Sequence, residues 1–231
     1  MTSLLKPRSD LPRMDAESVL IFDLDNTLYP SACNLFAQVS DLIGNYVRDT
    51  LSLEPDEAHR VQKDYFHRYG TTLRGLMTEH KIDPADYLDK VHDIDVSVVA
   101  PAPDLAKALD DLPGRKLIFT NASRGHAERV MGRLGIADRF ETIFDIVDAN
   151  YIPKPQQEPY DLLLARDDIN PAKAVYFEDM AKNLLPAKEM GMTTVWVHTD
   201  VEWAQAGNDD PRIDHHTDDL VGFLRTLAKA A

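Results

Sequence analysis

The sequence of 231 residues contains a single cysteine, Cys33. An intramolecular disulfide is therefore excluded, and the composition suits a reducing compartment. We expect Cys33 to be a small buried side chain, which is the usual place of a free cysteine. The sequence also lacks any run of 18 apolar residues that could span a bilayer, and its start lacks the apolar core of a secretory signal. These absences predict a cytoplasmic protein with no membrane partner and a loose tail over residues 1–17.

Positive charge is also scarce. Twenty-five lysines and arginines stand against 39 aspartates and glutamates, which gives a formal net charge of −14. Such a charge repels the phosphate backbone of a nucleic acid, so no nucleic acid polymer is expected as a partner. A small anionic substrate would need a local positive group. With 44% hydrophobic and 28% charged residues, the composition is that of a globular protein and excludes disorder of the whole chain.

Five short apolar runs alternate with stretches of helical spacing. They cover residues 18–25, 116–120, 142–147, 174–177 and 193–198. Runs that are apolar at every position are typical of strands buried on both faces of a parallel sheet. Their alternation with helices implies right-handed crossovers, and the sequence therefore predicts an α/β fold with helices on both faces of the sheet. In such sheets, ligands bind beyond the carboxyl ends of the strands.

About ninety residues separate the first two apolar runs, far more than one crossover helix needs. Apolar residues recur at three- and four-residue steps within 35–47 and again within 58–69, which predicts two amphipathic helices. The Asp83-Pro84 pair is typical of an N-cap followed by a first-turn proline, and it predicts a third helix that ends near His92. The inserted segment is therefore expected to be helical throughout.

Two prolines in the segment 100–103 exclude a helix there and mark the return of the chain to the sheet. The sequence shows neither an internal repeat nor a low-complexity segment. We therefore predict three parts, which are a tail over 1–17, a core domain over 18–30 and 101–231, and a helical cap over 31–100.

Acidic residues close two of the apolar runs. Asp23 and Asp25 end the first run, and residues two apart on a strand point to the same side, so both carboxylates can face one crevice. Like charges this close are tolerated when a divalent cation lies between them, and carboxylate ligands suit Mg²⁺. The spacing alone is a weak signal, because Asp93-Ile-Asp95 shows it at the solvated end of a predicted helix. The Glu178-Asp179 pair ends the fourth run and could complete an octahedral site, although such a pair can also cap a helix.

The remaining strand ends carry complementary groups. Thr120 and Asn121 offer a hydroxyl and an amide just before a predicted helix N-terminus, which would add backbone donors for an anion. Lys154 lies between two prolines in the loop after the third run. A single loop lysine is usually a solvated surface charge, but four carboxylates at neighbouring strand ends favour a role in the site. Acids, a hydroxyl and an ammonium group together are what transfer of a phosphoryl group requires.

At this point the chain resembles the haloacid dehalogenase superfamily of aspartate-nucleophile phosphatases. The resemblance rests on Asp23-Leu-Asp25-Asn-Thr-Leu28, Thr120, Lys154 and Glu178-Asp179, and it covers residues 19–196. It implies a three-layer Rossmann-like α/β core with a parallel sheet and an all-helical cap inserted after the first strand. It also implies Mg²⁺ as the cofactor and a small-molecule phosphomonoester as the substrate, with Thr120 and Lys154 holding the phosphoryl oxygens.

The resemblance assigns separate roles to the acids. Asp23 would attack the phosphorus and become an aspartyl phosphate, while Asp25 would protonate the departing alkoxide and later activate the hydrolytic water. Mg²⁺ would be held by Asp23, the backbone carbonyl of Asp25 and Asp179, with Glu178 bonding the metal or its waters. Related members of the superfamily often carry two aspartates at the positions of Glu178 and Asp179. This difference leaves open which of the two residues contacts the metal directly.

The resemblance narrows to the pyrimidine 5′-nucleotidase branch through residues 25–30, residues 69–76 of the insertion and Thr120-Asn-Ala122 with His126. It implies the cleavage of UMP and CMP, and so a nucleoside monophosphate substrate. The substrate-binding candidates are Tyr69, Thr71, Thr72, Arg74 and Asn121. Arg74 could pair with the phosphate or the base and Tyr69 could stack on the base, whereas an exposed helical arginine and a core tyrosine are the alternatives.

Three other functions remain as alternatives. A phosphomutase, or a phosphatase of sugar phosphates or other small phosphometabolites, would keep every core residue. A phosphoacceptor signalling domain gathers similar groups, but its acceptor would lie on a third strand without a helical insertion. A dehalogenase, by contrast, is disfavoured. It has no alkoxide to protonate and no phosphate charge to cancel, and so has no use for Asp25 or for the Glu178-Asp179 pair.

The end of the sequence is less informative. His215 and His216 lie among aspartates and suggest a transition metal, but Gly207, Asn208 and Pro211 predict a solvated loop instead. Apolar residues from 220 to 227 predict a closing amphipathic helix. The sequence leaves both a monomer and a homodimer open.

Overall fold

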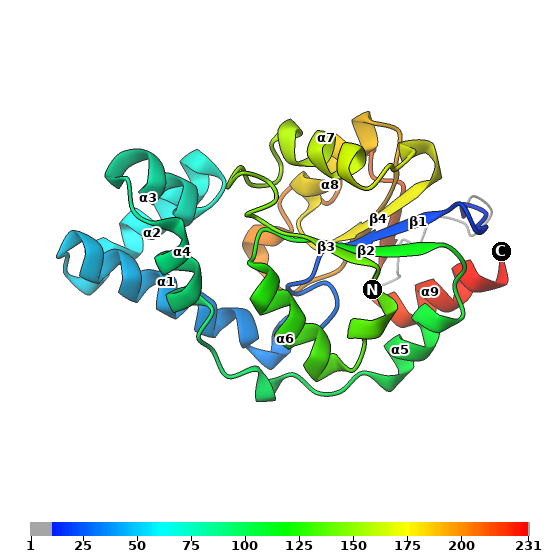
Figure 1. Cartoon of the computed structure of the whole chain (residues 1–231), viewed down its shortest axis with the longest axis horizontal. Helices are drawn as coiled ribbons and strands as arrows, with labels where there is room; N and C mark the ends of the chain where they lie inside the picture. The colour runs from blue at the N-terminus through cyan, green and yellow to red at the C-terminus, as the bar shows by residue number, and fades with distance from the viewer. Residues whose placement is uncertain (1–10, 231) are drawn as a thin grey trace.

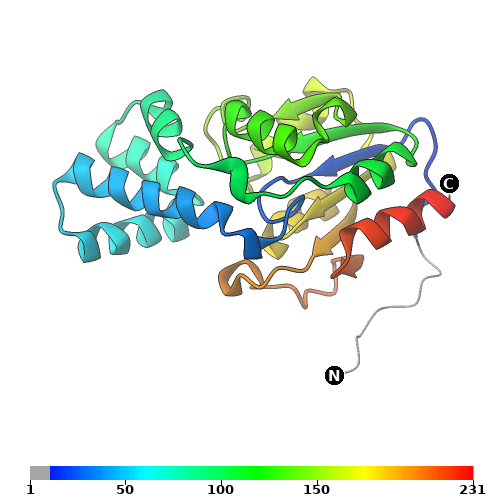
Figure 2. The same cartoon turned by 90° about the horizontal axis from the view of Figure 1, so that it is seen from below.

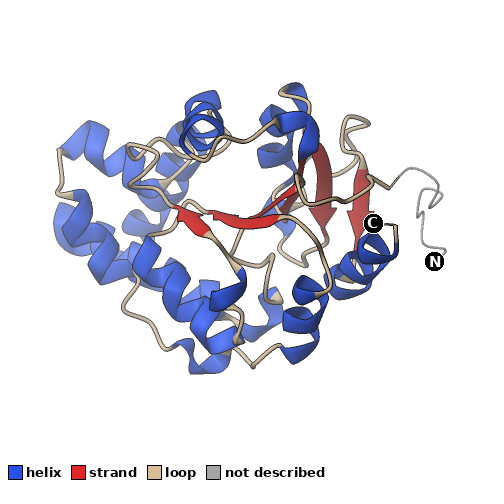
Figure 3. Ribbon diagram, turned by 45° about the vertical axis from the view of Figure 1, so that its right-hand side comes forward, coloured by secondary structure: helices blue, strands red, loops and turns tan. Residues whose placement is uncertain are grey.

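A computed structural model describes residues 11–230 and contains one sheet of parallel strands (Figure 3). The strands are β1 (Val19–Phe22), β2 (Arg115–Phe119), β3 (Thr142–Phe144), β4 (Ala174–Glu178), β5 (Thr193–Val197) and β6 (His215–Thr217). Their order across the sheet is β3-β2-β1-β4-β5-β6. The five predicted strands are thus present, each within a few residues of its expected bounds.

The sheet separates two layers of helices (Figures 1 and 2). One face is covered by α5 (Pro103–Asp110), α6 (Arg124–Leu134) and α9 (Leu220–Lys229), and the other by α7 (Gln157–Arg166) and α8 (Ala181–Glu189). Alternate strand residues point to opposite faces, so Leu20 and Phe22 pack in the first core, and Val19 and Ile21 pack in the second. This double burial explains the uninterrupted apolar runs, and the predicted three-layer α/β fold is confirmed.

A group of helices between β1 and β2 lies at one end of the molecule (Figure 1). These helices are α1 (Leu35–Leu51), α2 (Pro55–Tyr69), α3 (Thr72–His80) and α4 (Pro84–Val91). They enclose a core of their own around Val47, Leu76 and Tyr87. As expected, the Asp83 side chain caps α4 by accepting a hydrogen bond from Ala85 N. The all-helical insertion is confirmed, whereas the exact domain boundaries stay a prediction.

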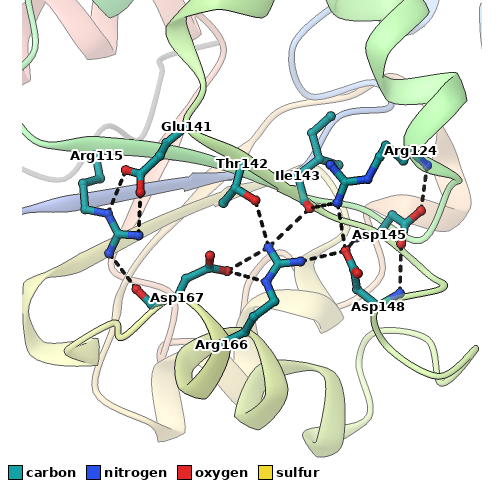
Figure 4. Close-up of polar contacts among 9 residues, drawn as sticks. All are labelled: Arg115, Arg124, Glu141, Thr142, Ile143, Asp145, Asp148, Arg166 and Asp167. Atoms are coloured by element: carbon teal, nitrogen blue, oxygen red, sulfur yellow. Dashed lines mark hydrogen bonds and ion pairs between the residues drawn. The ribbon is translucent and has the colours of Figure 1, made fainter.

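The third strand is shorter than the expected 142–147, because Asp145 organises a turn instead of extending β3 (Figure 4). Its Oδ1 accepts from Val147 N and Asp148 N, while its Oδ2 accepts from Arg124 N at the start of α6, 2.7 Å away. Arg124 and Arg166 both donate to the Ile143 carbonyl, at 2.6 and 3.3 Å. These guanidinium groups satisfy a carbonyl of an edge strand, which would otherwise be open to pairing with another chain.

The prediction of a solvated loop at His215 and His216 was wrong, because both residues lie in β6. Three residues amid turn-forming sequence carry little strand signal, and this strand depends on long-range contacts. Its register pairs Val195 with His215. Just before it, Asp214 accepts hydrogen bonds from the backbone and hydroxyl of Thr194, at 3.0 and 3.1 Å. In the described part of the chain, neither histidine belongs to a cluster suited to a metal ion.

Two smaller expectations also change. Cys33 is half-buried rather than buried. Residues 1–10 of the predicted tail lie outside the described residues, but Met14 is only 4% exposed and packs in the core, so the loose tail does not extend to residue 17. Within residues 11–230, none of the helices combines the length and the apolar character that crossing a bilayer requires.

Candidate active site

The strand order brings distant sequence segments to one edge of the sheet. From β1 the chain proceeds to β2 and β3 on one side, and then crosses to β4, β5 and β6 on the other. Such a change of direction opens a crevice at the carboxyl ends of the central strands. Asp23 follows β1, Thr120 follows β2 and Glu178 ends β4, so all three reach this crevice.

Three carboxylates gather there. Asp23, Glu178 and Asp179 each place a carboxylate oxygen within 4.8 Å of the others, and all three side chains are buried. Burial, and then the charge of Glu178, raises the pKa of Asp23 from 3.8 to about 7, although Lys154 opposes this. Burial and the charges of Glu178 and Asp23 raise the pKa of Asp179 well above its ordinary value. The fold therefore holds these acids together against their mutual repulsion.

The cluster fits a divalent cation with hard oxygen ligands. The Oδ2 atom of Asp179 is buried and has no hydrogen-bond partner among the described residues. A buried carboxylate oxygen without a partner is strongly disfavoured unless a cation accompanies it. Among the described residues, a single ammonium group forms ion pairs within this cluster, so the cluster has an excess of negative charge. These features match Mg²⁺, which takes a few carboxylates and completes its shell with water and substrate oxygens.

That ammonium group belongs to Lys154, whose side chain is 1% exposed. Its Nζ lies within hydrogen-bonding distance of four oxygens, which are Asp23 Oδ1 (2.9 Å), Glu178 Oε2 (2.7 Å), the Phe119 carbonyl (2.8 Å) and the Tyr176 hydroxyl (2.9 Å). Burial alone would lower the pKa of Lys154, but Asp23 and Glu178 outweigh it and raise the pKa above its ordinary value. Lys154 is therefore a fixed positive charge beside Asp23 rather than a solvated lysine.

Residues of the core and of the insertion both contact the loop around Lys154. Asn121 accepts from Lys154 N at 2.9 Å and donates to the Lys154 carbonyl at 3.4 Å. On the other side, Gly70 at the end of α2 has a φ of +86°, and a Cβ there would lie 2.9 Å from the Pro153 ring. Only glycine permits both this conformation and this approach of the insertion to the Lys154 loop.

Two threonines lie near the acids, and they have different contacts. Thr27 donates to Asp23 Oδ2 at 3.1 Å and accepts from Asp179 N at the same distance, so one hydroxyl connects two of the clustered acids. Thr120 accepts from Ala122 N at 3.0 Å, which leaves its hydroxyl hydrogen to donate elsewhere. Thr120 also lines the cavity described below.

Asp25 lies at the same crevice but has different hydrogen-bond partners from the three clustered acids. Its Oδ1 accepts from the Tyr29 hydroxyl at 2.5 Å and lies 2.8 Å from His126 Nε2. Burial would raise the pKa of Asp25, but His126 and Tyr29 outweigh it and lower the pKa below its ordinary value. The side chain of Asp25 is not part of the cluster of three, and the role of its backbone carbonyl in metal binding stays a prediction.

A cavity of about 400 Å³ adjoins these groups. Asp23, Asp25 and Lys154 form part of its wall from the core, and Thr71 and Thr72 from the insertion. Most of its wall is apolar. It could therefore hold a substrate considerably larger than a phosphate group.

One side of the cavity is aromatic. Trp203 lies in the short 3₁₀ turn Glu202–Ala204 after β5, and its ring centroid is 5.5 Å from that of Phe66 in α2 and 6.1 Å from that of Phe36 in α1. All three residues line the cavity. A side chain from the core thus meets two from the insertion at the rim of the site.

The five predicted substrate-binding residues separate into two groups. Asn121, Thr71 and Thr72 line the cavity, whereas Tyr69 and Arg74 are not among its lining residues. The Tyr69 hydroxyl donates to Glu79 instead. Both threonine hydroxyls already form hydrogen bonds with backbone groups. Thr71 caps α3 by accepting from Arg74 N, and Thr72 donates to the Gln62 carbonyl at 3.1 Å.

Sequence reasoning gave no role to four residues of the site. Thr27 and Tyr29 lie within the segment that starts at Asp23, and their spacing from the acids could have indicated a contact. His126 was noted only as part of a resemblance. Trp203 had no signal at all, because it comes from a segment that matched no pattern.

The chain is similar to known proteins in sequence and in fold. A family model of haloacid dehalogenase-like hydrolases matches residues 20–197. Phosphate metabolism protein 8 of Saccharomyces cerevisiae is 28% identical over 236 residues, which cover 94% of this chain and 73% of that protein.

Solved structures agree in fold at lower identity. The HAD phosphatase from Thermococcus onnurineus has a TM-score of 0.59 at 18% identity, with 92% of this chain and 95% of that one covered. The putative HAD-hydrolase YfnB from Bacillus subtilis, bound to magnesium, has a TM-score of 0.59 at 15% identity over 92% and 99% of the two chains. L-2-haloacid dehalogenase from Xanthobacter autotrophicus has a TM-score of 0.56 at 17% identity over 93% and 99%. Because the family model covers most of the chain and includes every strand-end acid described above, the protein belongs to the haloacid dehalogenase-like hydrolases.

Proposed function

We propose that this hydrolase is a Mg²⁺-dependent phosphomonoesterase that acts through an aspartyl phosphate and removes phosphate from pyrimidine nucleoside monophosphates such as UMP and CMP. The observation that carries the proposal is the pairing of Asp23 with the buried Lys154, next to a carboxylate cluster that fits Mg²⁺ and beside a largely apolar cavity. The relative in phosphate metabolism supports the same reaction class.

The acids favour a phosphatase over a dehalogenase, although dehalogenases share the fold. Carbon–halogen cleavage releases a halide, which needs no proton, and it involves no phosphate dianion. In this chain, Glu178 and Asp179 add two buried negative charges beside the nucleophile. Their burial is explained when a cation binds between them and a phosphoryl group.

The chain's own groups account for the first half of the reaction. An Asp23 carboxylate oxygen attacks the phosphorus in line with the leaving oxygen, which forms the aspartyl phosphate. Lys154 opposes the rise in the pKa of Asp23 and orients its carboxylate, and Thr120 donates its hydroxyl hydrogen to a phosphoryl oxygen. When bound by Asp23 and Asp179, with Glu178 contacting it directly or through water, Mg²⁺ would cancel the repulsion between two anions.

Asp25 supplies the proton transfers. The pKa of Asp25 is low in the free protein, and the negative charge of a bound phosphate would raise it. Asp25 can then give a proton to the departing alkoxide in the first half reaction and take one from the attacking water in the second. Asp25 forms part of the cavity wall and its side chain is not in the carboxylate cluster, which supports this role.

The cavity supports a nucleoside as the leaving group. An apolar wall with Phe36, Phe66 and Trp203 offers surfaces for a planar base, which a sugar phosphate would leave unused. Thr71 and Thr72 line the cavity from the insertion, which supports a contact with the ribose or the base. Arg74 and Tyr69 do not line the cavity, so they would contact the substrate only after a rearrangement of the insertion.

The proposal is tested by measuring phosphate release with and without Mg²⁺ from UMP, CMP, AMP, ribose 5-phosphate and other sugar phosphates. We expect turnover that EDTA abolishes, with the highest kcat/KM for the pyrimidine nucleotides. Asp23→Asn should remove turnover while leaving the circular dichroism spectrum unchanged. A higher kcat/KM for a sugar phosphate would show that the substrate is a sugar phosphate rather than a pyrimidine nucleotide. Stoichiometric phosphorylation of the protein without turnover would support a signalling domain instead.

A further inference from the structure

Both hydrogen-bond donors to Asp25 reach the same oxygen. The Tyr29 hydroxyl and His126 Nε2 lie 2.5 and 2.8 Å from Oδ1, whereas no residue between 11 and 230 donates to Oδ2. The carboxyl group is 15% exposed and lines the cavity. One oxygen is therefore held by the protein, and the other is left on the side of the substrate.

The surroundings of His126 determine which nitrogen carries its proton. The side chain is fully buried, and its Nδ1 has no hydrogen-bond partner in the described part of the protein. A proton on Nε2 gives Asp25 a second donor. A proton on Nδ1 alone would instead place two lone pairs against each other and leave a buried N–H without an acceptor. The ring is therefore a donor to Asp25.

The ring is also fixed in orientation. His92, at the end of α4, stacks on His126 with ring centroids 4.6 Å apart and an interplanar angle of 26°. The Nδ1 of His92 lies 2.9 Å from Ser123 Oγ, at the N-cap of α6, the helix that carries His126. His126 therefore cannot turn away from Asp25 without disturbing contacts between the helical insertion and the core.

We infer that His126 and Tyr29 are positioning residues for proton transfer: together they bind Oδ1 of Asp25 and so direct Oδ2 to the oxygen of the leaving group. The inference rests on the proposed phosphatase function. It adds two residues that touch neither the phosphate nor the metal ligands of the carboxylate cluster, and it specifies which oxygen of Asp25 acts.

The proton transfer affects only some substrates. As the bond between Asp23 and phosphorus forms, the bond to the ester oxygen breaks and its electron pair stays on that oxygen. A nucleoside alkoxide then takes the proton from Oδ2 of Asp25, whereas p-nitrophenolate is stable enough to leave without one. Misplacement of Oδ2 should therefore slow the cleavage of UMP much more than that of p-nitrophenyl phosphate.

A matched pair of variants isolates the hydrogen bond from the packing. His126→Gln keeps an N–H near the position of Nε2, and His126→Met has a similar size without a donor. Because kcat/KM includes only the steps up to the departure of the leaving group, hydrolysis of the aspartyl phosphate does not enter it. We expect kcat/KM for UMP to be about tenfold or more lower in the Met than in the Gln variant, against about twofold or less for p-nitrophenyl phosphate.

Tyr29→Phe tests the second donor without a change of shape and should lower kcat/KM for UMP selectively. Its control is Tyr46→Phe, which removes a similar hydroxyl–carboxylate bond, to Asp86, on the surface of the insertion. Equal losses on both esters, or no loss on UMP in either comparison, would overturn the inference. Failure of the unmodified protein to hydrolyse either ester would instead overturn the phosphatase proposal, and this inference with it.

Discussion

The ring of Trp203, which belongs to the core, meets the ring of Phe66, which belongs to the insertion, at an angle of 74° with 5.5 Å between centroids. Together with Phe36 they form an aromatic rim at the cavity. At this rim, core and insertion residues present flat apolar surfaces together. It therefore provides the sharpest test of whether the leaving group carries a base.

We expect Trp203→Ala to lower kcat/KM for UMP roughly 5- to 100-fold, since stacking of a base on an aromatic side chain contributes about 1–3 kcal/mol. The value for ribose 5-phosphate, which has the same sugar without a base, should change little. Trp203→Phe should recover most of the loss. Arg74→Ala is the comparison variant, because Arg74 does not line the cavity. A larger loss with Arg74→Ala would restore the sequence-based assignment of base or phosphate recognition to that residue.

Removal of the Lys154 ammonium group should affect both activity and stability. Lys154→Met leaves Asp23 and Glu178 without their buried cation, and breaking a buried ion pair in this way lowers the free energy of unfolding by about 3–5 kcal/mol. We expect no measurable turnover and a clearly lower urea midpoint. Lys173→Met is the control, because Lys173 pairs with Asp15 on the surface. Similar shifts in the two midpoints would contradict the special position of Lys154.

Much of the fold followed from local sequence. The apolar residues of β1 are buried on both faces, and Pro55 and Pro84 begin helices as first-turn prolines do. The carboxylate cluster could also be anticipated, because the carboxyl ends of parallel strands share one edge. These features depend on neighbours in the chain or on a general property of parallel sheets.

The features that sequence reasoning missed depend on contacts between distant residues. β6 forms because Thr194 binds Asp214 and β5 offers an edge, neither of which is visible in the segment itself. Asp145 ends β3 through a bond to the start of α6. Trp203 has a role only because the chain after β5 returns to the insertion. Tertiary context decides each of these cases.

Magnesium binding should reverse a destabilisation caused by the clustered acids. Asp179→Asn removes one of three buried like charges, so we expect the metal-free variant to have a higher Tm than the unmodified protein. Mg²⁺ should raise the Tm of the unmodified protein but not that of the variant. Asp93→Asn, at an exposed aspartate with the same Asp-x-Asp spacing, should leave both effects unchanged. A Mg²⁺-dependent rise in the Tm of Asp179→Asn would exclude Asp179 as a required ligand.

The buried ring of His92 should lower the free energy of unfolding in acid. Burial, followed by the charge of His126, lowers the pKa of His92 from 6.5 to about 3, so the folded protein keeps this ring neutral where the unfolded chain protonates it. Between pH 6.5 and about 3 the unfolded state therefore binds more protons, and the free energy of unfolding falls as the pH falls. One such group contributes a slope of up to about 1.4 kcal/mol per pH unit.

His92→Gln should reduce that slope in urea unfolding measured from pH 7 to pH 4, even if its stability at pH 7 is lower. His59→Gln, at an exposed histidine of α2, should leave the slope unchanged. The comparison of slopes removes the contributions of all other titrating groups, because these are common to the three proteins. If His92→Gln kept the full slope, the buried His92 ring would not be the group whose pKa differs between the folded and unfolded states.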